Sequence, residues 1–166
     1  MDKYHKINWL QLLEFVAVHG LAVTAIFYFS WGNLLVTIAL LWLTLGWGIA
    51  IGYHRLLSHR SFQPPKWFEY LLAILGSMAL QKGVISWITN HRIHHAFTET
   101  KDDPHTPNDG LFWSHIGWML KGIGQDHPFE VCQKYSPELC RDNFYLRFER
   151  VNRLPAIVVA ILLFWA

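Results

Sequence analysis

The stretch LLVTIALLWLTLGWGIAIGYHRLLSH, residues 34–59, joins an uncharged apolar run to a histidine-bearing end. Its first part, residues 34–52, is close to the roughly 20 residues that cross the hydrocarbon core of a bilayer as a helix. A similar run, residues 9–29, precedes it, and only residues 30–33 lie between the two. The sequence therefore predicts a tight hairpin of two transmembrane helices.

Composition agrees with an integral membrane protein. Of the 166 residues, 52% are hydrophobic and 16% aromatic, and nine are tryptophans, a residue typical of bilayer interfaces. The formal net charge is only +2 and the basic residues are scattered, so the sequence predicts no nucleic-acid partner.

Basic residues flank the outer ends of the hairpin, whereas the turn carries no charge. These residues are Lys3 and Lys6 before the first helix, and Arg55, Arg60 and Lys66 after the second. Cytoplasmic loops carry an excess of Lys and Arg. We therefore expect a multi-pass protein with its N-terminus and the boxes His54–His59 and His91–His95 on the cytoplasmic side. Arg55, Arg60 and Arg92 are expected to form a solvated basic rim, or else to meet an acidic electron donor or lipid headgroups.

The remaining chain is expected to be helical as well. Pro64 and Pro65 are expected to stop the helix that leads out of the membrane. The apolar run 67–80, about 14 residues, is interfacial, re-entrant or buried in protein. Residues 154–166 are apolar but too few to cross a bilayer. The predicted fold is all-α integral membrane, in this order: a hairpin (about 9–52), a cytoplasmic helical layer (about 53–152), and an incomplete third transmembrane helix (154–166).

Five histidines lie in two short boxes beside these apolar runs. The first box holds His54 and His59, and the second holds His91, His94 and His95. Imidazole is a good ligand for iron, copper, nickel and zinc, so the boxes predict a metal centre at the membrane rim. The i, i+3, i+4 spacing of the second box places its rings on one helix face. The i, i+5 spacing of the first box requires that the helix unwinds near Ser58 or that its two histidines serve different metals.

Other histidines stand alone in the sequence, and we expect them to serve as ordinary hydrogen-bonding residues. They are His5, His19, His115 and His127. The carboxylate-rich Glu-x-x-His pattern of soluble di-iron bundles is absent.

Four motifs in order resemble the membrane fatty-acid Δ9-desaturases. They are GYHRLLSHRSF (52–62), WITNHRIHH (87–95), TETKDDPH (98–105) and GLFWSHIGWML (110–120). The resemblance is nearest to the bacterial and cyanobacterial acyl-lipid branch, with stearoyl-CoA desaturases as relatives. Runner-up functions are a histidine-box hydroxylase and a non-enzymatic membrane protein that binds haem or metal.

The resemblance implies an O2-dependent di-iron oxidoreductase that introduces a cis double bond into a saturated acyl chain of an acyl-lipid or acyl-CoA. The implied iron ligands are His54, His59, His91, His94 and His95. Trp87 would border the acyl chain, and Asp103 and His105 would orient ligands or their loop. Electrons would come from a donor such as ferredoxin, and membrane lipid would surround the protein.

The sequence departs from the family pattern in lacking a third histidine box. We therefore expect residues 1–166 to be the N-terminal part of a single desaturase domain, truncated before that box. Five ligands are too few for two irons, so the chain alone is expected to be inactive.

Overall fold

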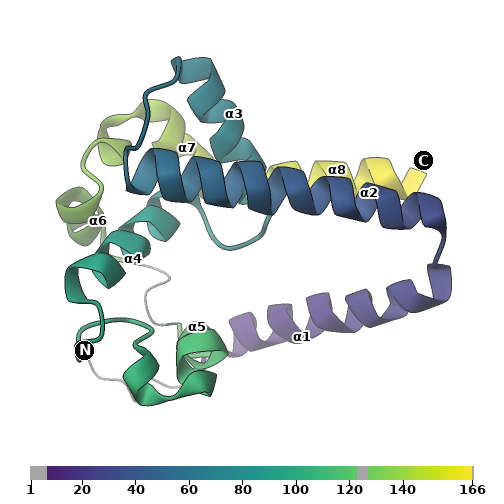
Figure 1. Cartoon of the computed structure of the whole chain (residues 1–166), viewed down its shortest axis with the longest axis horizontal. Helices are drawn as coiled ribbons and strands as arrows, with labels where there is room; N and C mark the ends of the chain where they lie inside the picture. The colour runs from purple at the N-terminus through teal and green to yellow at the C-terminus, as the bar shows by residue number, and fades with distance from the viewer. Residues whose placement is uncertain (1–6, 123–126, 166) are drawn as a thin grey trace. The chain divides into compact units, whose positions relative to one another are not determined.

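A computed structural model describes residues 7–122 and 127–165. Every regular element in those ranges is helical, which confirms the all-α class (Figure 1). Lys3, His5 and Lys6 lie outside the described residues. In chain order, with η for 3-10 or π-type helices, the elements are α1 (Trp9–Thr24), η1 (Ala25–Tyr28), α2 (Trp31–Leu41), η2 (Trp42–Ser58), α3 (Lys66–Ser77), α4 (Val84–Phe97), η3 (Pro107–Asp109), η4 (Trp113–Gly117), α5 (Trp118–Leu120), α6 (Phe129–Tyr135), η5 (Leu139–Arg141), α7 (Asn143–Arg150) and α8 (Leu154–Trp165).

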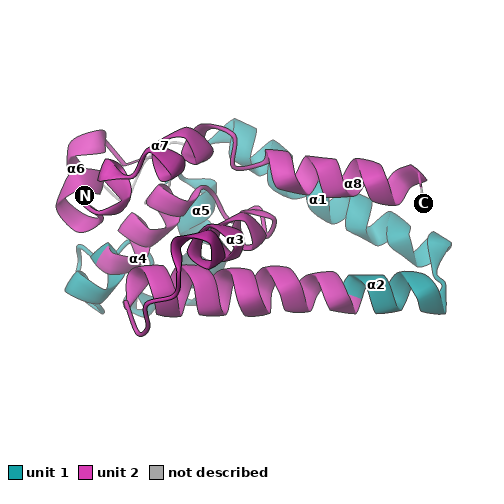
Figure 2. Cartoon of the chain, turned by 90° about the horizontal axis from the view of Figure 1, so that it is seen from above, with its two compact units in different colours: residues 1–37, 93–126 teal, residues 38–92, 127–166 magenta. Residues whose placement is uncertain are grey.

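The chain divides into two compact units. One comprises residues 1–37 and 93–126, and the other comprises residues 38–92 and 127–166 (Figure 2). The division falls inside two helices, α2 and α4, so each of these helices contributes residues to both units.

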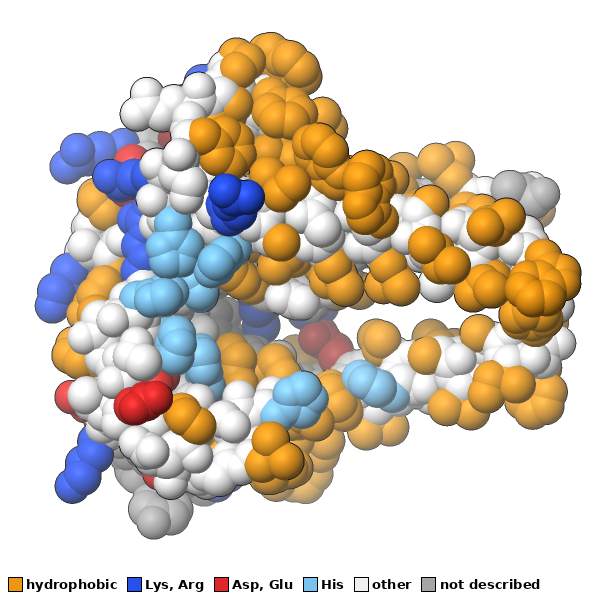
Figure 3. Space-filling view, viewed as in Figure 1, with side chains coloured by type: hydrophobic (Ala, Val, Ile, Leu, Met, Phe, Trp, Pro, Cys, Tyr) orange, Lys and Arg blue, Asp and Glu red, His pale blue; other side chains and the backbone are white. Residues whose placement is uncertain are grey.

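Within the described residues, two helices are long and apolar enough to cross a bilayer, as predicted. They are Trp9–Tyr28, with 20 residues, and Trp31–Ser58, with 28 residues. Neither α1 nor α2 buries a side chain, and apolar side chains cover the helices on the face shown in Figure 3. Ser30 begins α2 by accepting a hydrogen bond from the Asn33 N–H at 3.0 Å, a typical N-cap.

The second of these helices continues beyond residue 52 and ends at Ser58, before the two prolines. Arg60 takes a left-handed φ of 51°, and the N–H groups of Arg60 and Ser61 turn back to the carbonyls of Leu56 and Arg55. A left-handed residue is the common way to end a helix, although glycine usually provides it. The helix stop therefore precedes Pro64, and Pro65 instead serves as the N-cap of α3.

Helix α3 lies directly against η2 in the second unit. A Cβ added to Gly48 would collide with the backbone of Gly76, so the two helices touch through their main chains. One face of α3 is buried, including Leu72 and Ala73. The sequence left three alternatives for residues 67–80: an interfacial segment, a re-entrant segment, or a helix buried in protein. The buried face of α3 agrees with the third.

The core of the second unit fixes α4, the helix that carries the second histidine box. Fully buried side chains come from η2, α3, α4 and α7: Tyr53, Leu72, Val84, Ile88 and Tyr145. The Glu149 carboxylate of α7 accepts hydrogen bonds from the N–H groups of Ile85 and Ser86, at 2.8 and 3.0 Å. These amides lie in the first turn of α4, where N–H groups lack partners within the helix. The start of α4 is thereby fixed from α7.

Candidate metal centre

The first box closes through the hydrogen bonding of its own helix. Helix η2 is a π-type helix, and the His59 N–H bonds to the His54 carbonyl, five residues back, at 3.0 Å. With i→i+5 bonding, residues five apart lie about one turn from each other. The two Nε2 atoms are consequently 3.1 Å apart. On an α-helix, two residues with i, i+5 spacing would point in different directions. The π-type winding of η2 brings His54 and His59 onto the same face.

His91 of α4 joins this pair within the second unit. Its Nε2 lies 3.3 Å from Nε2 of His59, and its ring centroid is 4.8 Å from that of His54. Trp87, one turn earlier on α4, stacks on the His91 ring at 4.9 Å and 22°. The Trp87 indole N–H also donates to Gln81 Oε1 at 3.2 Å. Three imidazoles therefore face one another through Nε2, and one of them is held by an aromatic stack.

The donor set fits a transition metal. Two imidazole nitrogens that share an ion at about 2.0–2.1 Å, with an angle of 90–110° between them, lie about 2.9–3.4 Å apart. The separations of 3.1 and 3.3 Å fall within that range. The His54–His59 and His59–His91 pairs thus each match the spacing of two imidazoles on one metal ion.

His94 lies in the first unit with a second set of donors. Its Nδ1 is 2.9 Å from Oδ1 of the fully buried Asp103, and that carboxylate also accepts hydrogen bonds from the N–H groups of Glu99 and His105, each at 3.1 Å. Burial alone would raise the pKa of Asp103, but these bonds from His94, His105 and Glu99 hold it below its usual value. An ionised carboxylate can only accept, so Nδ1 of His94 carries a proton, and Nε2 is the ring nitrogen left for a metal.

His105 packs beside His94 in the same unit. The two rings stack at 4.2 Å and 26°, and the Trp118 ring centroid lies 4.9 Å from that of His105. Burial, followed by the neighbouring His94, lowers the pKa of His105, which favours its neutral form. Asp103 and His105 therefore both touch His94.

The helical spacing predicted for the second box is present, because α4 contains all three of its histidines. Within the two units, however, the box divides: His91 groups with His54 and His59, and His94 groups with Asp103 and His105. His95 follows His91 by one turn of α4, and its side chain is exposed.

The ion pairs of Glu138 near the boxes were not predicted from the sequence. Arg92, expected in a solvated rim, is only 16% exposed and pairs with Glu138 at 2.6 Å. Glu138 also pairs with Arg60 at 2.6 Å. These ion pairs cannot be predicted from the local sequence, because the two partners of each pair are 46 residues or more apart in the chain.

Comparison with known proteins identifies the family. A family model described as fatty acid desaturase matches residues 29–166. The chain is 42% identical over 160 residues to the sn-2 palmitoyl-lipid 9-desaturase of Nostoc sp. (strain 36), covering 96% of this chain and 56% of that protein.

Two further cyanobacterial relatives agree. An sn-1 stearoyl-lipid 9-desaturase of Anabaena variabilis is 43% identical, over 78% of this chain and 53% of its own length. An sn-1 stearoyl-lipid 9-desaturase of Synechocystis sp. (strain ATCC 27184 / PCC 6803 / Kazusa) is 37% identical, over 94% of this chain and 49% of its own length. The chain spans about half the length of these relatives. Together, the match across most of its length and these identities show that the chain belongs to the fatty acid desaturase family.

Proposed function

We propose that this chain supplies the first two histidine boxes of a fatty acyl Δ9-desaturase, which introduces a cis double bond into a saturated acyl chain. The observation that carries the proposal is the convergence of the Nε2 atoms of His54, His59 and His91. The named relatives act on palmitoyl or stearoyl lipids at position 9, which favours an acyl-lipid substrate over acyl-CoA. They also favour desaturation over a hydroxylase or a haem protein.

The proposed iron ligands are the histidines of both boxes, His54, His59, His91, His94 and His95. Two irons, when bound, would supply the oxidising power that removal of hydrogen from an unactivated methylene pair requires, with O2 as the oxidant. Five imidazoles are fewer than two irons need at roughly four to six ligands each. We therefore propose that groups outside this chain complete the site and that the chain alone is inactive.

The protein's own residues would orient ligands and substrate. Asp103 holds the proton on Nδ1 of His94 and so presents Nε2 toward a metal, and His105 packs on the ring. Trp87 would contact the acyl chain with the part of its ring that does not cover His91. An acyl chain needs an apolar path, and a large aromatic side chain beside a ligand suits its wall.

We further propose that the chain crosses the membrane as a hairpin, with its N-terminus and boxes in the cytoplasm. The helix Trp31–Ser58 is longer than the roughly 20 residues that span the hydrocarbon core, so its last turns, with His54, can lie outside the apolar layer. Helix α8 is apolar and would enter the bilayer as part of a third spanning helix, surrounded by membrane lipid. An electron donor such as ferredoxin would approach from the cytoplasm.

A chimera tests the activity. The 166 residues would replace the matching half of the Nostoc relative, and the acyl chains of host lipids would be measured by gas chromatography and mass spectrometry. We expect 9-monounsaturated acyl chains from the chimera, and none when it carries His91→Ala. A well-folded chimera without desaturation beside an active parent, or an active His91→Ala chimera, would contradict the proposal.

A further inference from the structure

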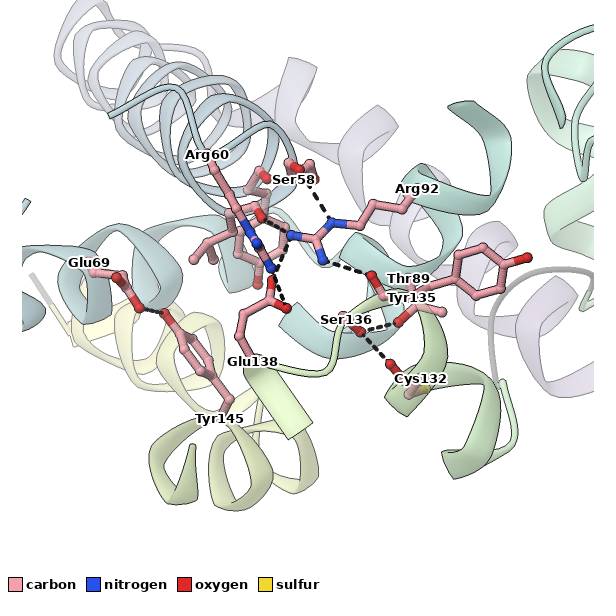
Figure 4. Close-up of polar contacts among 12 residues, drawn as sticks. Ser58, Arg60, Glu69, Thr89, Arg92, Cys132, Tyr135, Ser136, Glu138 and Tyr145 are labelled. Atoms are coloured by element: carbon pink, nitrogen blue, oxygen red, sulfur yellow. Dashed lines mark hydrogen bonds and ion pairs between the residues drawn. The ribbon is translucent and has the colours of Figure 1, made fainter. Parts of the chain in front are cut away.

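Arg92 binds the segments that carry the first box. It directly follows His91 on α4, and Arg92 lies in the second unit together with the groups that its guanidinium binds (Figure 4). Its Nη2 donates to the Leu57 carbonyl at 2.6 Å, and its Nε donates to the Ser58 carbonyl at 3.3 Å. Leu57 and Ser58 are the last two residues of η2, immediately before His59. Arg92 therefore ties the residue beside His91 to the residues beside His59.

The same guanidinium also binds a second helix end. Its Nη1 donates to the carbonyl of Tyr135 at 2.7 Å, and Tyr135 is the last residue of α6. The last carbonyls of a helix lack partners within the helix and carry the negative end of its dipole. The Arg92 guanidinium donates hydrogen bonds to the last carbonyls of both η2 and α6. Through these bonds it holds both helix ends to α4.

Glu138 completes this arrangement from the segment after α6. One oxygen accepts from Arg92 and the other pairs with Arg60, each at 2.6 Å, and Arg60 directly follows His59. Burial alone would raise the pKa of Glu138, but hydrogen bonds from Arg92 and Arg60 keep it below its ordinary value. One ionised carboxylate thus binds the neighbour of His91 and the neighbour of His59.

We propose that Arg92 and Glu138 form a clamp that sets the separation of His91 from the His54–His59 pair, and so act as positioning residues for the proposed metal centre. The inference rests on the proposed function. Each end of the clamp lies next to a histidine in the chain, so a shift of the guanidinium displaces one ring relative to the other. Groups that do not bind the metal themselves but orient its ligands are important for binding. Their loss typically lowers metal affinity by about 10- to 100-fold.

The positions of the acceptors around Arg92 require an arginine, and another cationic side chain would not be enough. Its planar fork offers five N–H donors in fixed directions, which allows bonds to several carbonyls and a carboxylate together. Lysine offers one compact ammonium group that cannot span the Leu57, Tyr135 and Glu138 acceptors. Arg92→Lys therefore keeps the charge but loses the clamp.

Titration of the full chain with Co²⁺ in detergent tests the clamp. Visible absorption reports both affinity and ligand geometry, and His59→Ala identifies the signal that depends on the first box. We expect Arg92→Gln and Arg92→Lys to weaken Co²⁺ binding by about tenfold or more and to alter the spectrum. Arg141→Gln, at an exposed arginine of the same unit, should leave both unchanged.

The outcomes separate the clamp from the metal centre. Histidine-dependent binding that is equal in the wild-type, Arg92→Gln and Arg92→Lys chains, with equal helix content by circular dichroism, overturns the clamp and leaves the metal centre in place. A wild-type chain with no histidine-dependent binding overturns both. If Arg92→Gln loses its helix content, Arg92→Lys decides: weakened binding by a folded chain supports the clamp, and wild-type affinity refutes it. A lowered unfolding temperature with an unchanged spectrum and affinity indicates a stabilising role only and also refutes it.

Discussion

At the residue scale, Asp103 bonds to Nδ1 of His94, and we propose that this leaves Nε2 as the nitrogen that binds a metal. The carboxylate is fully buried and its bonds come from His94 Nδ1 and two backbone N–H groups. Asp103→Asn places an amide N–H among these donors, so we expect metal affinity to fall by about 10- to 100-fold. Zn²⁺ titration of the full chain checks this. Asp102→Asn, at the exposed neighbour, is the control; equal loss in both variants would mean that the loop, and not the carboxylate, matters.

Glu138 makes the stability of the chain depend on pH. Its pKa is lower in the folded protein than in the unfolded chain, so its contribution is complete above the unfolded value of about 4.3 and disappears as the pH falls through the folded value. We expect Glu138→Gln to lower the free energy of unfolding at neutral pH, and the difference from wild type to shrink in acid. Unfolding in SDS at several pH values, followed by circular dichroism, measures this. A difference that is constant with pH would contradict the role given to the charge.

At the element scale, the contact of η2 with α3 depends on glycines, and Gly48 approaches the opposite backbone most closely. A Cβ at Gly48 meets the backbone of Gly76, which cannot move aside as a flexible side chain can. We expect Gly48→Ala to lower the free energy of unfolding by about 1–3 kcal/mol, as overpacking does. Gly46→Ala is the matched control in the same helix, because its nearest neighbour is the Trp42 side chain at 3.6 Å. Equal stability of the two variants in SDS unfolding would show that the helices separate without cost.

Sequence predicts those elements whose signal is local. The length of the two apolar runs predicted the two long helices. The spacing of His91, His94 and His95 predicted that all three lie on one helix. The end of η2 at Ser58 was not predictable, because Arg60 rather than glycine takes the left-handed turn. The π-type winding that joins His54 to His59 was equally hidden, since it changes only which carbonyl each N–H selects.

Interactions between distant elements have no sequence signature either. The bonds of Arg92 to Leu57 and Tyr135 involve backbone carbonyls, which any residue type provides. Glu149 at the start of α4 is a comparable case, 63 residues from Ser86. The histidines proposed as ligands could therefore be named from the sequence, whereas the groups that hold them in place could not.

At the scale of the whole molecule, metal binding and catalysis should separate. The boxes supply five imidazoles, and three of them already converge within one unit. That suffices to bind a metal but not to fill two iron sites at roughly four to six ligands each. We therefore expect the isolated 166-residue chain to bind iron in a histidine-dependent manner while producing no 9-monounsaturated acyl chains.

Iron content by mass spectrometry and acyl-chain analysis of host membranes measure the two properties on the same sample. The Nostoc relative, expressed in the same host, shows whether O2 and electrons are supplied there. Unsaturated acyl chains above the level of an empty vector, lost on His91→Ala, would mean that these residues already build a working centre. The proposed need for ligands from outside the chain would then be wrong, because catalysis would be proceeding with the groups that this chain contains.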